Sequence, residues 1–173
     1  MKALFVGHRL PYPPKRGGKI RPFNIISHLS KRHEVTVCSI ARSAEEEAEG
    51  QGLRQHCARL VVGRVSDPLQ AVRMVARLPT PTPSSMGWFY SRELAHRIDD
   101  MLATETFDLV FVHCSSVAQY VLGARGMPRI LDFGDMDSQK WLEYVGYKPF
   151  PMKAGYWLEG TKLEREERRL ARR

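Results

Sequence analysis

Cysteine is scarce in this chain, and its placement argues against two classes of protein. The three cysteines, Cys38, Cys57 and Cys114, are odd in number and far apart in the sequence. That pattern is unlike the disulfide framework of a small secreted domain and fits a reducing compartment. None of them belongs to a Cys-x-x-Cys pair, which argues against a zinc site. We therefore expect a cytoplasmic protein without structural zinc.

Long apolar runs are missing as well. No run approaches the roughly 18 residues that a membrane-spanning helix needs, and the charge at Lys2 with polar residues after Gly7 is unlike a signal peptide. The 173 residues, 43% of them hydrophobic and 27% charged, suffice for one globular domain with a sizeable core. The formal net charge of +8 is compatible with nucleic acid, an anionic membrane surface or a phosphorylated ligand, and alone it does not choose among them.

The two common phosphate-binding fingerprints are also absent. No Gly-x-Gly-x-x-Gly occurs, and Gly18-Lys19 is followed by isoleucine rather than the serine or threonine of a P-loop. What is present is a short apolar run, a long basic loop, the pair Gly17-Gly18 and then a helical pattern. Backbone N–H groups at such a helix start attract anions, and Arg9, Lys19 and Arg21 add positive charge. The alternative is a plain loop-to-helix turn.

Apolar, β-branched runs alternate with helical patterns along the chain, which predicts an α/β fold. The expected strands are nearly continuous in apolar residues, as in a parallel sheet covered on both faces; they are 2–6, 34–40, 58–62, 107–112 and 129–133. Helical patterns occupy 18–31, 43–50, 67–77, 91–103, 115–124 and 138–145, and two of them start on serine cap residues, Ser43 and Ser91. We expect a Rossmann-like, doubly wound parallel sheet of order 3-2-1-4-5, with a ligand crevice beyond the carboxyl ends of the strands.

Two segments stand apart from this pattern. Residues 78–90 carry alternating prolines, which predict an irregular insert without helix, followed by Trp88-Phe89-Tyr90. These aromatics either fold back onto the sheet or form an apolar lip for a lipid-linked substrate or a membrane surface. Residues 156–173 predict one helix that stops without a cap, so we divide the chain into a domain over 1–155 and a helix over 156–173 leading to a further domain.

Titratable residues gather where the fourth and fifth expected strands end. His113 follows the fourth strand and is a candidate either to hold a sugar hydroxyl or to act as a base, unless it only bonds a neighbouring loop. Asp132, Asp135 and Asp137 cluster after the fifth strand. We expect Asp137 to cap the following helix and Asp135 to be the site residue.

Two longer stretches carry a family resemblance. Arg-Leu-Pro-Tyr-Pro-Pro-Lys-Arg-Gly-Gly-Lys-Ile-Arg at 9–21 and Leu-Asp-Phe-Gly-Asp-Met-Asp-Ser-Gln-Lys-Trp at 131–141 resemble the N-terminal domain of subfamily-4-like (GT-B) glycosyltransferases. In particular they are similar to sugar transferases associated with bacterial exopolysaccharide and PEP-CTERM/exosortase gene clusters. The resemblance spans the whole chain.

The resemblance implies one half of a two-domain enzyme that works without a bound metal or other cofactor. Its partners would be a nucleotide-sugar donor, bound mainly by a second domain, and a glycan or lipid-linked acceptor, with peripheral contact at the inner face of the membrane. Gly17 and Gly18 match the loop that approaches the donor diphosphate, and His113 matches the position near the reacting sugar. Arg9, Lys19, Arg21 and Asp135 are assigned to the acceptor side or the cleft, and the fragment alone is expected to be inactive.

The residues leave one alternative function open and argue against another. A non-catalytic Rossmann-like module that binds a nucleotide or a polyanion has the basic charge as its support, although we expect no nucleic-acid partner. A receiver-like signalling domain would need acidic residues at the end of the first strand, where the chain instead has Gly7-His8-Arg9.

Overall fold

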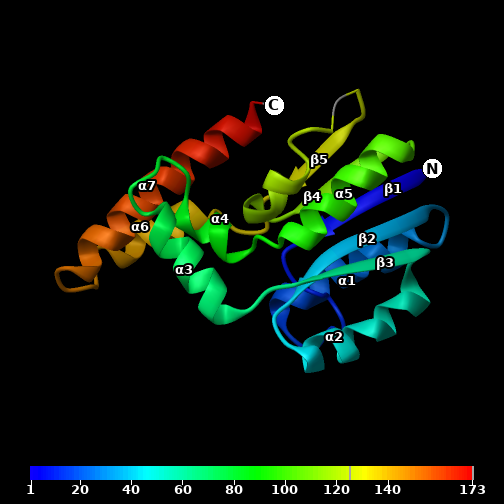
Figure 1. Cartoon of the computed structure of the whole chain (residues 1–173), viewed down its shortest axis with the longest axis horizontal. Helices are drawn as coiled ribbons and strands as arrows, with labels where there is room; N and C mark the ends of the chain where they lie inside the picture. The colour runs from blue at the N-terminus through cyan, green and yellow to red at the C-terminus, as the bar shows by residue number, and fades with distance from the viewer. Residues whose placement is uncertain (125, 173) are drawn as a thin grey trace.

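Five parallel strands form the centre of the fold, in the order β3-β2-β1-β4-β5 (Figure 1). The computed structural model describes residues 1–124 and 126–172. The strands are β1 (Lys2–Gly7), β2 (Glu34–Ala41), β3 (Arg59–Arg64), β4 (Leu109–His113) and β5 (Arg129–Asp132). The predicted doubly wound sheet and its order 3-2-1-4-5 are confirmed.

Both faces of the central strands β2, β1 and β4 are buried, which explains why these strands are apolar almost throughout. On one face, Phe5 stacks on Phe111 of the neighbouring strand with ring centroids 5.2 Å apart. That face is covered by α1 (Gly17–Leu29) and the 3₁₀ helix η1 (Gln51–His56). On the other face, Leu4 and Val6 pack under α5 (Arg92–Thr104) and the 3₁₀ helix η2 (Ser115–Tyr120). The helical pattern expected over 115–124 is thus a shorter 3₁₀ segment.

Serine caps begin two of the helices, as the sequence predicts. The Ser43 hydroxyl accepts a hydrogen bond from the Glu46 N–H at 3.1 Å at the start of α2 (Ala44–Gly50). The Ser91 hydroxyl does the same for the Leu94 N–H at 3.4 Å at the start of α5. Each hydroxyl satisfies one of the N–H groups that a helix start leaves without an intrahelical partner.

The insert after β3 contains more helix than its prolines suggest. The expectation of an irregular segment over 78–90 is wrong for its second half, because α4 (Ser84–Trp88) begins directly after the last proline, Pro83. A proline before the first helical residue removes no intrahelical hydrogen bond. α4 follows α3 (Asp67–Arg77). Phe89 and Tyr90 fold back against the core, where Tyr90 stacks on Tyr120 with ring centroids 5.8 Å apart.

Two helices, α6 (Asp137–Tyr144) and α7 (Met152–Ala171), pack side by side after β5 (Figure 1). Asp137 is the first residue of α6 and Met136 occupies its cap position, so the expected Asp137 cap is wrong. Gly160 lets the two helices approach closely, since a Cβ there would lie 2.8 Å from Leu142 Cδ2. The expected helix start at Tyr156 falls inside α7, and its continuation into a further domain stays a prediction.

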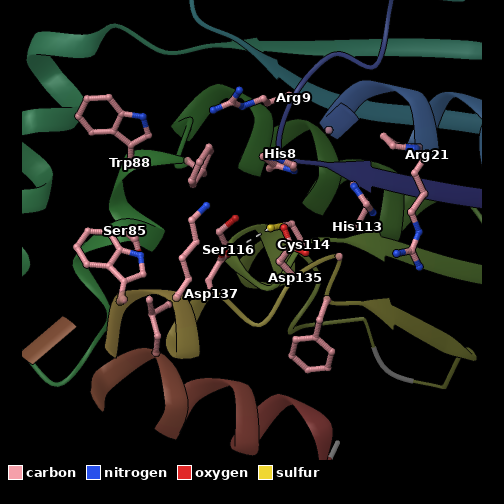
Figure 2. A pocket seen from close by; sticks show the side chains of 18 of the residues that line it. His8, Arg9, Arg21, Ser85, Trp88, His113, Cys114, Ser116, Asp135 and Asp137 are labelled. Atoms are coloured by element: carbon pink, nitrogen blue, oxygen red, sulfur yellow. Dashed lines mark hydrogen bonds between the residues drawn. The ribbon is translucent and has the colours of Figure 1, made fainter. Parts of the chain in front are cut away.

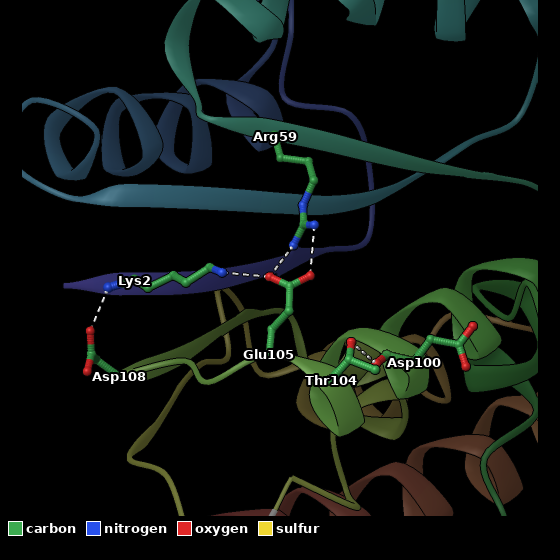
Figure 3. Close-up of polar contacts among 6 residues, drawn as sticks. All are labelled: Lys2, Arg59, Asp100, Thr104, Glu105 and Asp108. Carbon is green, nitrogen blue, oxygen red and sulfur yellow. Dashed lines mark hydrogen bonds and ion pairs between the residues drawn. The ribbon is translucent and has the colours of Figure 1, made fainter.

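The amino-terminal edge of the sheet is held by an ionic clamp around Glu105 (Figure 3). The Glu105 carboxylate accepts hydrogen bonds from Lys2 Nζ at 2.6 Å and from both terminal nitrogens of Arg59 at 2.8 and 3.0 Å. The clamp thereby joins β1, β3 and the end of α5. These bonds lower the pKa of Glu105 to about 2. In the part of the chain that the structure describes, no helix is both long and apolar enough to cross a bilayer.

Candidate functional site

A hollow of the described chain lies at the carboxyl ends of the strands, where the strand order reverses between β1 and β4. The chain leaves β1 toward α1 on one face and leaves β4 toward η2 on the other, which opens a crevice between them. The cavity has a volume of about 710 Å³. Its side chains come from the loops after β1, β4 and β5 and from α1, α3, α4, α6 and α7 (Figure 2). We call it the cleft.

Most of the predicted site residues meet in this cleft. Its lining includes Arg9, Gly17, Gly18, Arg21, His113 and Asp135. Lys19 is not among the lining residues. Its ammonium group lies 3.6 Å from a Glu46 carboxylate oxygen and donates to the Tyr12 carbonyl at 3.3 Å. Because successive helical residues diverge by about 100°, Lys19 points to the α2 side while its neighbour Gly18 borders the cleft.

The start of α1 presents bare backbone to the cleft. The cap residue, Arg16, is extended, and among the described residues no side chain caps this helix. A Cβ placed on Gly17 or Gly18 would meet no atom within 4 Å, so the fold's own packing does not require glycine there. Neither glycine has a left-handed backbone. What the pair offers is unobstructed access to the first N–H groups of a 13-residue helix, where an anion is favoured.

His113 is the last residue of β4 and is fixed by a carboxylate on the next strand. Its Nδ1 lies 3.0 Å from Asp132 Oδ2, and His113 is 5% exposed. An ionised carboxylate only accepts hydrogen bonds, so Nδ1 carries the proton and Nε2 is left as the acceptor of the ring. The other oxygen of Asp132 binds Arg21 at 2.9 Å and the Gly134 N–H at 3.0 Å. Asp132 therefore joins α1, β4 and β5 around one imidazole.

Asp132 is a candidate site residue that the sequence places in the acidic cluster but does not distinguish from Asp135. The signal for it was present in the strand register. His113 and Asp132 are direct neighbours in the parallel pairing of β4 with β5. Both residues lie at the carboxyl ends of the expected strands, and the carboxyl ends of parallel strands lie on the same side of a sheet. Asp135 does line the cleft, three residues further along the loop.

A second histidine, His8, shares the cleft with His113. The two rings have centroids 5.8 Å apart, and Phe89 meets His8 edge-on at 5.5 Å. Burial lowers the pKa of His8 to about 4, helped by the nearby His113 and Arg9. His8 is therefore neutral at neutral pH, and the fixed positive charges of this wall come from Arg9 and Arg21.

The turn from β4 into η2 is strained at Cys114. Its φ of 86° is the one left-handed value at a described residue other than glycine, and such a conformation costs about 1–3 kcal/mol. The Cys114 N–H donates to the Asp132 carbonyl at 2.8 Å, which helps to hold the turn. Burial raises the pKa of the Cys114 thiol, and burial likewise raises the pKa of Asp137, whose carboxylate lies 3.8 Å from Cys114 Sγ. A protonated thiol is a poor nucleophile. The contribution of Cys114 to the cleft is therefore the backbone turn between β4 and η2 rather than a reactive sulfur.

The cleft combines opposite charges without a metal-binding cluster. Arg9, Arg21 and Lys140 line it together with Asp135 and Asp137. Within the described residues no three His, Cys, Asp or Glu side chains come together as metal ligands. Comparison of the chain with known protein families, with curated proteins and with solved structures finds no match. The chemistry of the cleft is therefore the basis for the functional argument.

Proposed function

We propose that this chain is the acceptor-side domain of a GT-B glycosyltransferase. The complete enzyme would move a sugar from a nucleotide donor to a glycan or lipid-linked acceptor during polysaccharide biosynthesis, with the donor held mainly by a second domain. The observation that carries the proposal is the meeting of two groups in one cleft: the open start of α1 at Gly17-Gly18 and the imidazole of His113 fixed by Asp132. One group suits a departing diphosphate, and the other suits a sugar hydroxyl.

The proposed division of labour follows from these two groups. An acceptor hydroxyl donates its proton to His113 Nε2 as its oxygen bonds to the anomeric carbon of the donor sugar, and the bond from that carbon to the diphosphate breaks. Asp132 stabilises the imidazolium that forms, as a carboxylate next to a histidine does in other acid–base sites. The helix-start N–H groups, with Arg9 and Arg21, offset the charge that grows on the diphosphate. In a retaining enzyme His113 would hold the hydroxyl and need not take its proton.

Binding by the chain itself tests the diphosphate half of the proposal. Titration of the ¹⁵N-labelled chain with a nucleoside diphosphate is expected to shift the amide signals of Gly17 and Gly18. Gly18→Ala leaves the fold intact, because its Cβ meets no atom within 4 Å, but its methyl group obstructs the approach of the anion. Loss of one hydrogen bond to a charged group predicts about a tenfold weaker affinity. His28→Ala, at the far end of the same helix, is the matched control.

The results separate the two candidate functions. Shifts confined to the cleft, lost in Gly18→Ala and retained in His28→Ala, support the transferase domain. Equal binding of any polyanion, with a steep dependence on salt and no effect of Gly18→Ala, favours the non-catalytic module instead. Sugar transfer by residues 1–173 without a second domain would contradict the two-domain part of the proposal.

A further inference from the structure

In helix α3 the apolar face points outward, whereas the apolar stripe of an ordinary surface helix faces the core. Its outward face is apolar: Leu69 is 48% exposed, Val72 65%, Val75 61% and Leu78 44%. Its inward face is polar. Gln70 is fully buried and donates to the Tyr90 carbonyl at 3.2 Å, and Arg73 donates to the same carbonyl at 2.5 Å. The polar groups of α3 are thus used to hold the helix on the domain, and its apolar side chains are left outside.

The turn between α6 and α7 exposes a second apolar group, rich in aromatic residues. Its exposed members are Tyr144, Tyr147, Phe150, Met152 and Trp157, with Phe150 83% and Tyr147 76% exposed. Lys148 and Lys153 lie within the same stretch, and no acidic residue occurs from Tyr144 to Leu158. Aromatic side chains mixed with lysine are typical of the layer between water and lipid acyl chains.

The two groups form one surface. Leu78, the residue directly after α3, and Met152 of α7 line the same small cavity, of about 270 Å³, together with Met74 and Tyr156. The Lys162 ammonium on α7 donates to the carbonyls of Arg77 and Leu78 at 3.2 and 2.7 Å, which ties the helices together. Figure 1 shows α3 in the half of the molecule that is remote from the N-terminus and the α6–α7 turn at the far end of that half. We call this the α3/α7 face.

We propose that the α3/α7 face docks onto a lipid bilayer that contains anionic lipids. The charge of the face agrees with this partner, because Lys148 and Lys153 are the charged residues of 144–158, and neither that stretch nor residues 68–91 contain an acidic residue. Basic residues beside exposed apolar side chains add attraction to an anionic leaflet. A symmetric contact with a second copy would instead set like charges against each other, since an isologous interface pairs a patch with itself.

The docking surface differs from the aromatic lip that the sequence suggested. Phe89 and Tyr90 pack inward, against the core, and Trp88 lies beneath the guanidinium of Arg42 at 5.5 Å. The lipid-facing aromatics are those of the α6–α7 turn. Met74 and Trp141 line both the small cavity and the cleft. On the proposed function, an acceptor could therefore keep its lipid chain in the bilayer while its sugar reaches His113.

Sedimentation with vesicles tests the docking surface without any sugar chemistry. The chain is mixed with sucrose-loaded vesicles of phosphatidylcholine, with or without about 30% of the anionic lipid phosphatidylglycerol. The wild-type chain is expected to sediment with the anionic vesicles. Val72→Asp with Val75→Asp should weaken binding about 100-fold or more, since two exposed valines that would enter the bilayer are replaced by two charged side chains. Lys148→Ala with Lys153→Ala should weaken it roughly 30-fold, on anionic vesicles alone.

Ile130→Asp, on the edge strand β5, is the matched control, because Ile130 is 47% exposed and lies outside this face. It should sediment as the wild type does. Circular dichroism melts check that each variant folds. If the double valine variant does not fold, the double lysine variant still tests the docking surface. Absence of sedimentation with anionic vesicles overturns the proposal. Sedimentation that neither pair of substitutions weakens overturns it too, as does a concentration-dependent dimer that the valine pair abolishes.

Discussion

Glu159 offers the sharpest test of how the cleft is held together. It lies on α7, is 4% exposed, and its two carboxylate oxygens accept hydrogen bonds from the N–H groups of Ser84 at 2.9 Å and Ser85 at 2.7 Å. These two groups begin α4, a helix of five residues that is too short to be stable alone. Ser85 and Trp88 of α4 line the cleft. The carboxylate of Glu159 therefore fixes one wall of the site from a helix behind it.

The cost of Glu159→Ala can be worked out from these contacts. A hydrogen bond to a charged group contributes about 1.5–3 kcal/mol. The Ser84 N–H is buried and loses its partner outright, whereas Ser85 is half-buried and regains part of the loss from water. Glu159 also offsets the burial that lowers the pKa of Arg77. The expected loss is about 2–4 kcal/mol, a large part of the roughly 5–15 kcal/mol that stabilises a typical domain.

Urea denaturation followed by circular dichroism measures this loss, and Glu164→Ala is the matched control. Glu164 lies on the same helix and pairs with Arg168 at 2.7 Å on the surface. Such exposed pairs contribute about 0.3–0.5 kcal/mol. The melting temperature of Glu159→Ala should fall by about 6–12 °C if the loss is about 3 kcal/mol. Equal unfolding free energies for the two variants would refute the reasoning that Glu159 holds α4.

Two further predictions concern the sheet edge and the helix pair. Because the clamp lowers the folded-state pKa of Glu105 from 4.5 to about 2, its stabilisation is complete above pH 4.5 and is lost as the pH falls toward 2. Glu105→Gln should therefore unfold more readily than the wild type in urea at pH 7, and the difference should shrink between pH 4.5 and 2; a difference independent of pH would contradict this. Gly160→Ala forces a methyl group against Leu142, whereas Gly155→Ala in the same helix meets no atom within 4 Å. Overpacking costs about 1–3 kcal/mol, so thermal melts should rank Gly155→Ala above Gly160→Ala, and the reverse order would show that α6 yields without cost.

Much of this fold could be predicted from the sequence, because the alternation of apolar strands with amphipathic helices follows directly from which residues are buried. Strands buried on both faces must be apolar throughout, and helices between them force parallel pairing, so the alternation predicts the sheet and its order. Local chemistry also predicted the caps at Ser43 and Ser91, since a hydroxyl can satisfy a helix-start N–H from within the same turn. The helix after Pro83 was missed because the prolines before it dominated the pattern.

The parts that could not be predicted depend on contacts between distant residues. Lys19 leaves the cleft because Glu46, on another helix, attracts it. Gly160 weakens the helical pattern locally, and only the approach of Leu142 explains it. The inverted face of α3 is the clearest case. Hydrophobic periodicity shows that Asp67–Arg77 has two unlike faces, but which face turns inward is decided by the polar partners that Tyr90 offers.

The clamp at Glu105 has a consequence for how this protein can change over generations. It lies at the amino-terminal edge of the sheet, while the cleft lies at the carboxyl edge, five residue steps away along β1. At ~3.3 Å per residue the separation is about 17 Å, beyond the range at which the energetic effects of two substitutions usually interact. Substitutions in the cleft therefore leave the clamp's contribution intact, and stability gained at the clamp can offset the cost of variation in the cleft.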